Sequence, residues 1–580
     1  MDPAKEDAIY NARFVRIVCV GAGASGICLA YKLKHHFQDF SLIVFDKNPG
    51  IGGTWYENRY PGCACDVPSH NYTYSFDPKP DWTSVYPGSA EIRSYFEDFV
   101  SRHELQQYIR TSQLVTRTAW DEGKGEWEVE VTNLDTNELT QATCDILVHA
   151  TGYLNKPAWP EVTSLASFRG IKLHTADYDE KTQLHDRDVI VIGSGSSAVQ
   201  LLPAIQPIVK SVKMIIRTPS WILPDISTES SVMSPERIKQ LVQSPELLLN
   251  VRRENERTMN SIFSVYMKGS VLQEQAKVLL ELATREALCN YGAADKMIPD
   301  FAVGCKRVIP SGLGFLKALQ EKNVSVVHSP TSSFTVSGCI TDDGQHHDAD
   351  VIIFATGFDT SYIPRYPILA SGRNLQAEWQ RSISGYMGVA MSGFPNTFSM
   401  LGPYTPVTNG PALIAIEAQA DYICSFIDRY QTEAIFSMTP RSDVCDEFRD
   451  YVANAMEKLV WTDNCRNSHN NHSIGSRSPT NWPGSTLHYL EAIREPRWDD
   501  WEIKYSGNRF SWMGNGVSQV EWDPTADLAY YIKVYDDEPH LSRKARHLKI
   551  AKTGSQPIRQ LHRQEKLRSA GPKTAQSETP

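Results

Sequence analysis

Glycine-rich turns are the residues of this sequence best suited to hold a phosphate group. Residues 13–20 form a short β-branched run, and Gly21, Gly23 and Gly26 follow it before a segment with apolar residues at helical spacing. Such glycines permit a tight turn and a close approach of the backbone to a pyrophosphate, which the amides of the helix N-terminus then face. The pattern predicts a dinucleotide-binding unit of strand, turn and helix.

The same pattern occurs a second time later in the chain. Residues 188–192 are a continuous Val/Ile run after an initial Asp, and Gly193, Gly195 and Ser196 follow before another helical segment. The sequence therefore predicts two dinucleotide sites.

The residue after the next strand differs between the two units, which indicates two different dinucleotides. Asp46, about twenty residues beyond the first glycines, would accept hydrogen bonds from ribose hydroxyls and suits FAD. In the second unit Arg217 and Thr218 stand where an NAD site would carry an acid. A guanidinium and a hydroxyl match a 2′-phosphate, so we predict NADPH there. The alternative is that Arg217 is an ordinary surface residue.

These patterns predict an α/β fold with two Rossmann-like dinucleotide-binding domains, for FAD and NADP, and a helical insertion in the second. Strands are expected at residues 143–149 and 349–354, each ending in Ala-Thr-Gly, and a long helix at residues 411–430. Residues 234–291 have helical periodicity and few breakers, which indicates the insertion. The expected domains are the first part of the FAD domain at 1–155, the NADP domain at 156–355 with its insertion at about 222–300, the second part of the FAD domain with a lid loop at 356–542, and a basic disordered tail at 543–580.

Composition and charge limit the classes of function. With 41% hydrophobic and 22% charged residues the chain has a globular composition, and no apolar run is long enough to span a membrane. A net charge of −10 argues against nucleic-acid binding. The N-terminal residues do not resemble a secretory signal, so we expect a cytoplasmic protein. In that compartment the eleven cysteines should be reduced and form no paired framework. No metal site is predicted, because the adjacent histidines lack a supporting set of ligands.

Three further segments resemble one family, the Baeyer–Villiger monooxygenases. Residues 52–66, GGTWYENRYPGCACD, resemble its GGxWxxxxYPGxxxD element, and residues 168–178, FRGIKLHTADY, resemble its fingerprint FxGxxxHxxxW, with Tyr178 in place of Trp. Residues 304–307, GCKR, are similar to the segment that carries the family's active-site arginine. The resemblance implies that NADPH reduces the flavin, that O2 then forms an anionic flavin peroxide, and that this peroxide converts a small-molecule ketone to an ester or lactone.

The resemblance also implies roles for individual residues. Arg307 would keep the peroxide anionic and stabilise the developing oxyanion, and Asp66 would orient that guanidinium. Lys306 would bind the 2′-phosphate. Thr54 and Trp55 would contact a cofactor, although core packing is an equal expectation for Trp55.

The fingerprint residues are expected to act by position. The resemblance assigns them the coupling of NADP-domain motion to the flavin site, and we assign His174 no proton transfer. They are Phe168, Gly170, His174, Thr175 and Tyr178.

Two other functions remain open at this point. A flavin N- or S-oxygenating enzyme shares both nucleotide sites, and a catalytically silent flavin-binding protein could keep the fold. The resemblance is to larger, fungal-type members and implies that the substrate is a bulky terpenoid, steroid or polyketide ketone in secondary-metabolite biosynthesis. Tyr404 departs from the small polar residue expected at its position, and residues 465–482 lack the aromatic and lysine residues common there. The sequence does not indicate whether the chain forms oligomers.

Overall fold

The described residues fall into two units. The computed structural model describes residues 8–160, 162–223, 232–310, 312–406, 410–463, 465, 470–471, 478–479 and 481–532. One unit is Ile9–Asn515, and the other contains Ala8 and the residues from Gly516 onward. The predicted tail at 543–580 and most of the predicted lid loop lie outside the described residues.

A five-stranded parallel sheet carries the first glycine-rich turn. Its strand order is β18-β7-β1-β2-β3, and every pairing in it is parallel. The central strands β1 and β7 are buried on both faces, as their nearly continuous apolar sequences require. Helix α1 packs against α10 and α3. The elements are β1 (Val15–Val20), α1 (Ala24–His36), β2 (Phe40–Phe45), α3 (Ser89–Arg102), β3 (Ile109–Arg110), β7 (Ile146–His149), β18 (Thr397–Ser399) and α10 (Ala412–Thr432).

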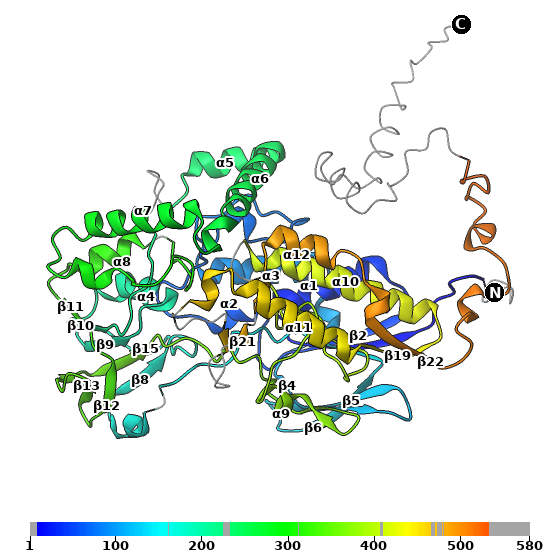
Figure 1. Cartoon of the computed structure of the whole chain (residues 1–580), viewed down its shortest axis with the longest axis horizontal. Coiled ribbons are helices and arrows are strands. Elements are labelled where there is room, and N and C mark those ends of the chain that lie inside the picture. The colour runs from blue at the N-terminus through cyan, green and yellow to red at the C-terminus, as the bar shows by residue number, and fades with distance from the viewer. Residues whose placement is uncertain are drawn as a thin grey trace, which may run out of the picture. The chain divides into compact units, whose positions relative to one another are not determined.

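A second five-stranded parallel sheet carries the other turn. Its order is β11-β10-β9-β15-β8, with α4 and α8 packed together beside it (Figure 1). After this sheet the chain returns to the first one, where β18 pairs with β7. The fold is therefore α/β, with two parallel sheets. The elements are β8 (Ile171–His174), β9 (Asp188–Ile192), α4 (Ser196–Ile205), β10 (Ser211–Ile215), α8 (Leu313–Ala318), β11 (Val324–Val327) and β15 (Val351–Phe354).

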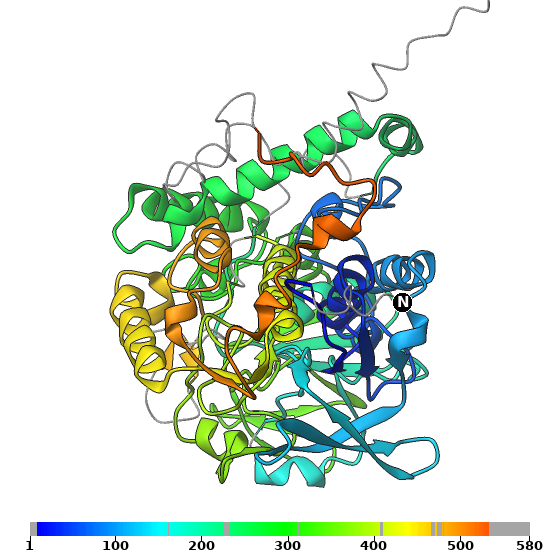
Figure 2. The same cartoon turned by 90° about the vertical axis from the view of Figure 1, so that its right-hand side faces the viewer.

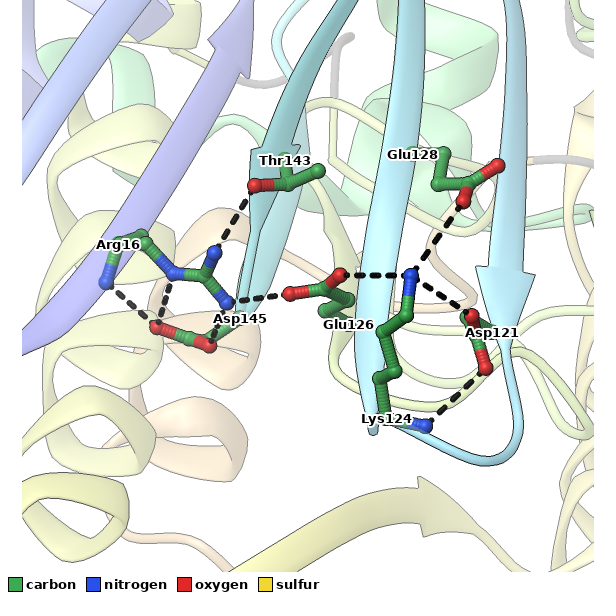
Figure 3. Close-up of polar contacts among 7 residues, drawn as sticks. All are labelled: Arg16, Asp121, Lys124, Glu126, Glu128, Thr143 and Asp145. Atoms are coloured by element: carbon green, nitrogen blue, oxygen red, sulfur yellow. Dashed lines mark hydrogen bonds and ion pairs between the residues drawn. The ribbon is translucent and has the colours of Figure 1, made fainter.

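An additional sheet, mostly antiparallel, is joined to the start of β1 by a charged network. Figure 3 shows Arg16 between Asp145, Glu126 and Thr143, with Arg16 Nη2 2.7 Å from Asp145 Oδ1 and 2.8 Å from Glu126 Oε2. The hydrogen bond to Asp145 is the first cause that raises the pKa of Arg16. The network lies at the end of β1 opposite the glycine-rich turn. The sheet contains β4 (Gln113–Asp121), β5 (Glu126–Asn133), β6 (Leu139–Cys144), β16 (Ile368–Ala370) and β17 (Arg373–Asn374).

In its described residues, the segment between the neighbouring strands β10 and β11 contains three helices that precede α8. Helix α6 contacts the first part of the chain at Ser69–Asn71, and α7 contacts α8. In both views these helices and the sheet of β4, β5 and β6 lie on opposite sides of the first parallel sheet (Figures 1 and 2). The helices are α5 (Pro235–Gln243), α6 (Pro245–Ser261) and α7 (Val271–Ala287).

The remaining elements complete the edges of these layers. No helix of the described residues is long and apolar enough to cross a membrane. The domain boundaries given above stay a prediction. The remaining elements are α2 (Thr54–Glu57), β12 (Thr331–Phe334), β13 (Gly338–Thr341), β14 (His346–Asp348), α9 (Leu375–Trp379), β19 (Ile435–Pro440), α11 (Ser442–Met456), β20 (Asn470–Asn471), β21 (Ser478–Pro479), α12 (Thr486–Ile493) and β22 (Trp501–Tyr505).

Candidate active site

The first glycine-rich turn leaves the start of α1 open to an anion. Gly21 has a φ of +113°, and a Cβ there would lie 2.4 Å from the carbonyl oxygen of Ala150. A Cβ on Gly26 would lie 2.0 Å from the carbonyl oxygen of Gly21. Gly23 precedes α1, and no side chain caps the helix. The helix amides are therefore available to a pyrophosphate, and these residues fit the dinucleotide that the sequence predicts.

Asp46 fixes this turn from within. Its Oδ2 accepts the N–H of Ala22 at 2.7 Å, and its Oδ1 accepts the N–H of Asn48 at 2.8 Å. The residue is only 6% exposed, and burial raises its pKa while the two N–H groups oppose that shift. The carboxylate thus lies at the carboxyl end of β2, against the glycine-rich turn. Its contact with a ribose stays a prediction.

The element that contains Trp55 packs beside the first turn. A Cβ on Gly53 would lie 3.0 Å from the Cα of Gly23, so the two loops touch through their backbones. Thr54 is exposed at the start of α2. Trp55 is buried, and its Nε1 donates to the hydroxyl of Tyr72 at 3.0 Å. Trp55 is thus packed in the core, and its contact with a cofactor stays a prediction.

Asp66 and Arg307, 241 positions apart, form a two-contact ion pair. Arg307 Nε lies 2.5 Å from Asp66 Oδ2, and Arg307 Nη2 donates to Asp66 Oδ1 at 2.7 Å. The side chain of Arg307 is 46% exposed and that of Asp66 is 20% exposed. The charge of Asp66 raises the pKa of Arg307, against the opposing effect of burial. The site thus contains a permanent positive charge that is held in one direction.

Two tyrosines that the sequence did not single out lie near this ion pair. Burial raises the pKa of Tyr153 and of Tyr266, and the charge of Arg307 opposes both shifts. Tyr153 directly follows the first Ala-Thr-Gly segment, and that position was a signal available in the sequence. Tyr266 lies in the segment between α6 and α7, where nothing in the sequence marked it.

The second glycine-rich turn repeats the geometry of the first. Gly193 has a φ of +133°, and a Cβ there would lie 2.3 Å from the carbonyl oxygen of Ala355. Gly195 precedes Ser196 at the start of α4, which no side chain caps. A Cβ on Gly195 would meet no atom within 4 Å. The start of α4 is therefore open to a second pyrophosphate.

The residues predicted to bind the 2′-phosphate lie near one another. Burial, and next the charge of Arg217, lower the pKa of Lys306. In the part of the chain that the structure describes, neither of these two residues forms an ion pair with a carboxylate. Thr218 is held by its backbone, because its carbonyl oxygen accepts the hydroxyl of Ser194 at 2.6 Å. The charge of Asp300 also acts on Lys306, but neither cation is paired with a carboxylate in the described residues, and two such cations suit a phosphate dianion.

Comparisons with known proteins cover nearly the whole chain. Two family models match, a NAD(P)-binding Rossmann-like domain over residues 19–87 and L-lysine 6-monooxygenase/L-ornithine 5-monooxygenase over residues 89–281. The FAD-binding monooxygenase moxY of Dothistroma septosporum is 33% identical over 542 residues, which are 91% of this chain and 86% of that protein. A Baeyer–Villiger monooxygenase of Pseudomonas aeruginosa is 30% identical over 494 residues, 83% of this chain and 90% of that protein. The chain belongs to the Baeyer–Villiger monooxygenase family.

The fold of this Baeyer–Villiger monooxygenase agrees with solved members of the family. The structure of cyclohexanone monooxygenase from Rhodococcus sp. Phi1 bound to NADP+ matches with a TM-score of 0.74 and 26% identity, and covers 85% of this chain and 100% of that chain. The protein is an NADPH-dependent flavin monooxygenase, and its cofactors are FAD and NADP.

The family fingerprint lies where the chain passes between the two sheets. The Nδ1 atom of His174 accepts the N–H of Ala176 at 3.0 Å, so the proton is on Nε2, which lies 3.2 Å from the hydroxyl of Thr356. That hydroxyl donates to the carbonyl oxygen of Ala158 at 2.6 Å. Burial lowers the pKa of His174, so the ring is neutral. Such contacts fit a positional role, which stays a prediction.

The other fingerprint residues contact neighbouring backbone or apolar side chains. Phe168 and Tyr178 are buried, and the N–H of Thr175 donates to the carbonyl oxygen of Phe354 at 3.0 Å. A Cβ on Gly170 would lie 2.5 Å from a backbone carbonyl oxygen of the neighbouring strand segment. These residues therefore attach β8 to β15.

The expectation that no cysteines pair was wrong for two of them. Cys305 and Cys465 form a disulfide in an apolar cluster with Trp221, Phe301 and Val303. The two are 160 positions apart, and only the folded cluster brings them together. Because Cys305 precedes Lys306 in the chain, this bond lies directly beside the cationic site. Most of the other cysteines are free and buried, as expected.

Proposed function

We propose that this enzyme inserts an oxygen atom beside the carbonyl of a bulky ketone, of terpenoid, steroid or polyketide type, in secondary metabolism. The observation that carries the proposal is the ion pair of Arg307 with Asp66. Bound FAD and NADPH would supply the electrons that activate O2. Arg307 keeps the attacking oxygen anionic and stabilises the oxyanion formed on the ketone carbon. Asp66 accepts two N–H groups of Arg307 and so sets its direction.

Tyr404, which departs from the family pattern, is packed in the core, and solved relatives support a cyclic ketone as substrate. This residue stands where a small polar one was expected, but it is buried, with its ring 5.4 Å from that of Phe448 in an edge-on contact. Its hydroxyl donates to the carbonyl oxygen of Ile383 at 3.4 Å. The large side chain is therefore packed in the core. Solved structures of cyclohexanone monooxygenase hold cyclohexanone or ε-caprolactone, which supports a cyclic ketone and a lactone product here.

The proposal is tested by product analysis of the variant Arg307→Ala. We expect the purified variant to keep its yellow FAD while lactone formation falls at least about 100-fold. Arg59→Ala is the matched control, because Arg59 is exposed in the same sequence element as Asp66 but pairs with Glu180. Normal lactone formation by Arg307→Ala, or a wild-type preference for cyclohexanone over polycyclic ketones, would contradict the proposal.

The match to the lysine and ornithine monooxygenase model favours a second candidate, oxygenation of an amine nitrogen. That reaction requires a protonated, electrophilic oxygen, which the fixed charge of Arg307 disfavours. Incubation of the same protein with L-lysine and L-ornithine separates the two candidates. A hydroxylamine product without any lactone would replace our assignment.

A further inference from the structure

The side chain of Gln200 connects α4 to the loop that leads to Asp66. Its Oε1 accepts the hydroxyl of Tyr60 at 2.6 Å and the N–H of Ala64 at 3.4 Å. Its Nε2 donates to the carbonyl oxygen of Ala64 at 2.9 Å. One side-chain amide thus binds both backbone groups of a residue that is 136 positions away in the sequence.

The same loop lies directly on the helix. Gly62 has a φ of +80°, and a Cβ there would lie 2.3 Å from the carbonyl oxygen of Gln200 and 3.2 Å from the Cβ of Ala204. There is no space for a side chain between the loop and α4. The contact therefore transmits small displacements, because neither backbone can move toward the other.

Each end of this contact leads to a functional group. Gln200 lies about one helical turn after Ser196, where the second dinucleotide is expected to bind. Ala64 lies two residues before Asp66, whose carboxylate holds Arg307. A helix moves as a rigid element, so a shift at the start of α4 displaces the Gln200 amide as well.

We propose that Gln200 is a positioning residue that couples occupancy of the second dinucleotide site to the Asp66–Arg307 pair. An anion bound to the amides at the start of α4 favours one position of that helix. Gln200 then fixes the backbone of Ala64, and with it the carboxylate that directs Arg307. In this proposal Gln200 acts through Ala64 and Asp66 and not on the reacting atoms.

Hydrogen–deuterium exchange of the FAD-loaded protein tests this coupling without turnover. In the wild type, NADP+ should slow exchange of the amides of residues 60–66 about fivefold or more. In Gln200→Met, which keeps the side-chain length but has no amide, we expect less than a twofold effect. Gln206→Met is the matched control, because Gln206 follows the same helix and its Nε2 donates to Asn323 at 2.8 Å. Equal protection by NADP+ in the two variants would overturn the proposal.

Kinetics provide a readout that a purely structural role would not move. For Gln200→Met we expect a KM for NADPH within about threefold of the wild-type value. The kcat for product formation should fall about tenfold, and a larger share of the oxidised NADPH should yield hydrogen peroxide. A parallel loss of FAD, NADPH binding and thermal stability would mean that Gln200 only stabilises the fold.

A second substitution keeps the test decisive if Gln200→Met does not fold. Gln200→Glu keeps the acceptor for Tyr60 but loses the donor to Ala64, and we expect intermediate protection by NADP+. Wild-type protection and wild-type peroxide release in Gln200→Glu would contradict the coupling through Ala64.

Discussion

The two glycine-rich turns have the same backbone design. In both, the first glycine has a positive φ, and its N–H donates to the last residue of the neighbouring strand, from Gly21 to Phe45 at 2.7 Å and from Gly193 to Ile215 at 3.1 Å. In both, the alanine of an Ala-Thr-Gly segment packs against the first glycine of the turn. Its carbonyl oxygen lies so close that this first glycine has no space for a Cβ. The backbone geometry that is expected to admit a pyrophosphate is therefore the same at the first glycine of both turns.

The turns differ in the residues that follow the second strand of each unit. Asp46 is buried and binds two backbone N–H groups of its own turn, whereas Arg217 is exposed and lies near the second cation, Lys306. In the first turn the charge of Asp46 is thus used within the protein. In the second turn the charge of Arg217 is exposed and can contact a ligand. We therefore predict that the choice of dinucleotide depends on side chains that the backbone geometry of the turn leaves free to vary.

We expect the greatest loss of cofactor affinity when a methyl side chain is added to the first glycine of either turn. Gly21→Ala places a Cβ 2.4 Å from one carbonyl oxygen, and Gly193→Ala places one 2.3 Å from another, both at a positive φ. We expect Gly21→Ala to lose FAD by more than about 100-fold, and Gly193→Ala to stay yellow but lose NADP+ binding to a similar degree. The flavin absorbance per chain and an NADP+ titration measure both. If Gly193→Ala also lost its FAD, the turns would not be separate sites.

Strands and turns with local signals were predicted well from the sequence. The strand expected at 188–192 is confirmed exactly as β9, and the helix expected at 411–430 as α10, within two residues at either end. The strand expected at 143–149 was wrong as one element, because it divides into the end of β6 and β7. Asp145 separates them, since its carboxylate accepts the backbone N–H and the guanidinium of Arg16.

The parts of the site that depend on distant contacts could not be predicted in this way. The proximity of Asp66 and Arg307 came only from the family resemblance, and the structure shows it directly. The disulfide of Cys305 and the amide contacts of Gln200 have no local signal, because a cysteine or glutamine in a helix or loop has many possible environments. Only folding decides which distant residue it meets.

A smaller effect is expected from removing the charges of the second turn. Arg217→Ala combined with Lys306→Met should weaken NADPH about 100-fold, because each charge-assisted bond contributes about 1.5–3 kcal/mol. The affinity for NADH, which lacks the 2′-phosphate, should change less than about threefold. Lys210→Met is a suitable control, because Lys210 is exposed and pairs with Asp188 at the other end of β9. Equal losses of NADPH and NADH would place the phosphate pocket elsewhere.

The corresponding change in the first turn should be milder. In the wild type, both carboxylate oxygens of Asp46 accept backbone N–H groups. Asp46→Asn keeps one of these acceptors, but its amide NH2 faces the other N–H, which is then left without an acceptor. One unpaired buried donor costs about 1–3 kcal/mol, so we expect FAD to bind about tenfold more weakly or worse. NADP+ affinity of the FAD-saturated variant should not change. An equilibrium titration of the apoprotein with FAD measures the effect, and unchanged FAD affinity would mean that Asp46 does not shape the turn.

The smallest effect is a pH dependence that only the second turn should show. A phosphate dianion favours the protonated form of Lys306, so NADP+ affinity is complete below the pKa of this residue in the free protein and falls as the pH rises through it. Burial and the charge of Arg217 lower that pKa, so the loss of NADP+ affinity should begin at a lower pH than for an exposed lysine. Removing the repulsion in Arg217→Ala should move the loss to higher pH. If NADP+ affinity fell at the same pH in Arg217→Ala as in the wild type, the two cations would not act on one phosphate. The difference between the two turns would then not explain the choice of dinucleotide.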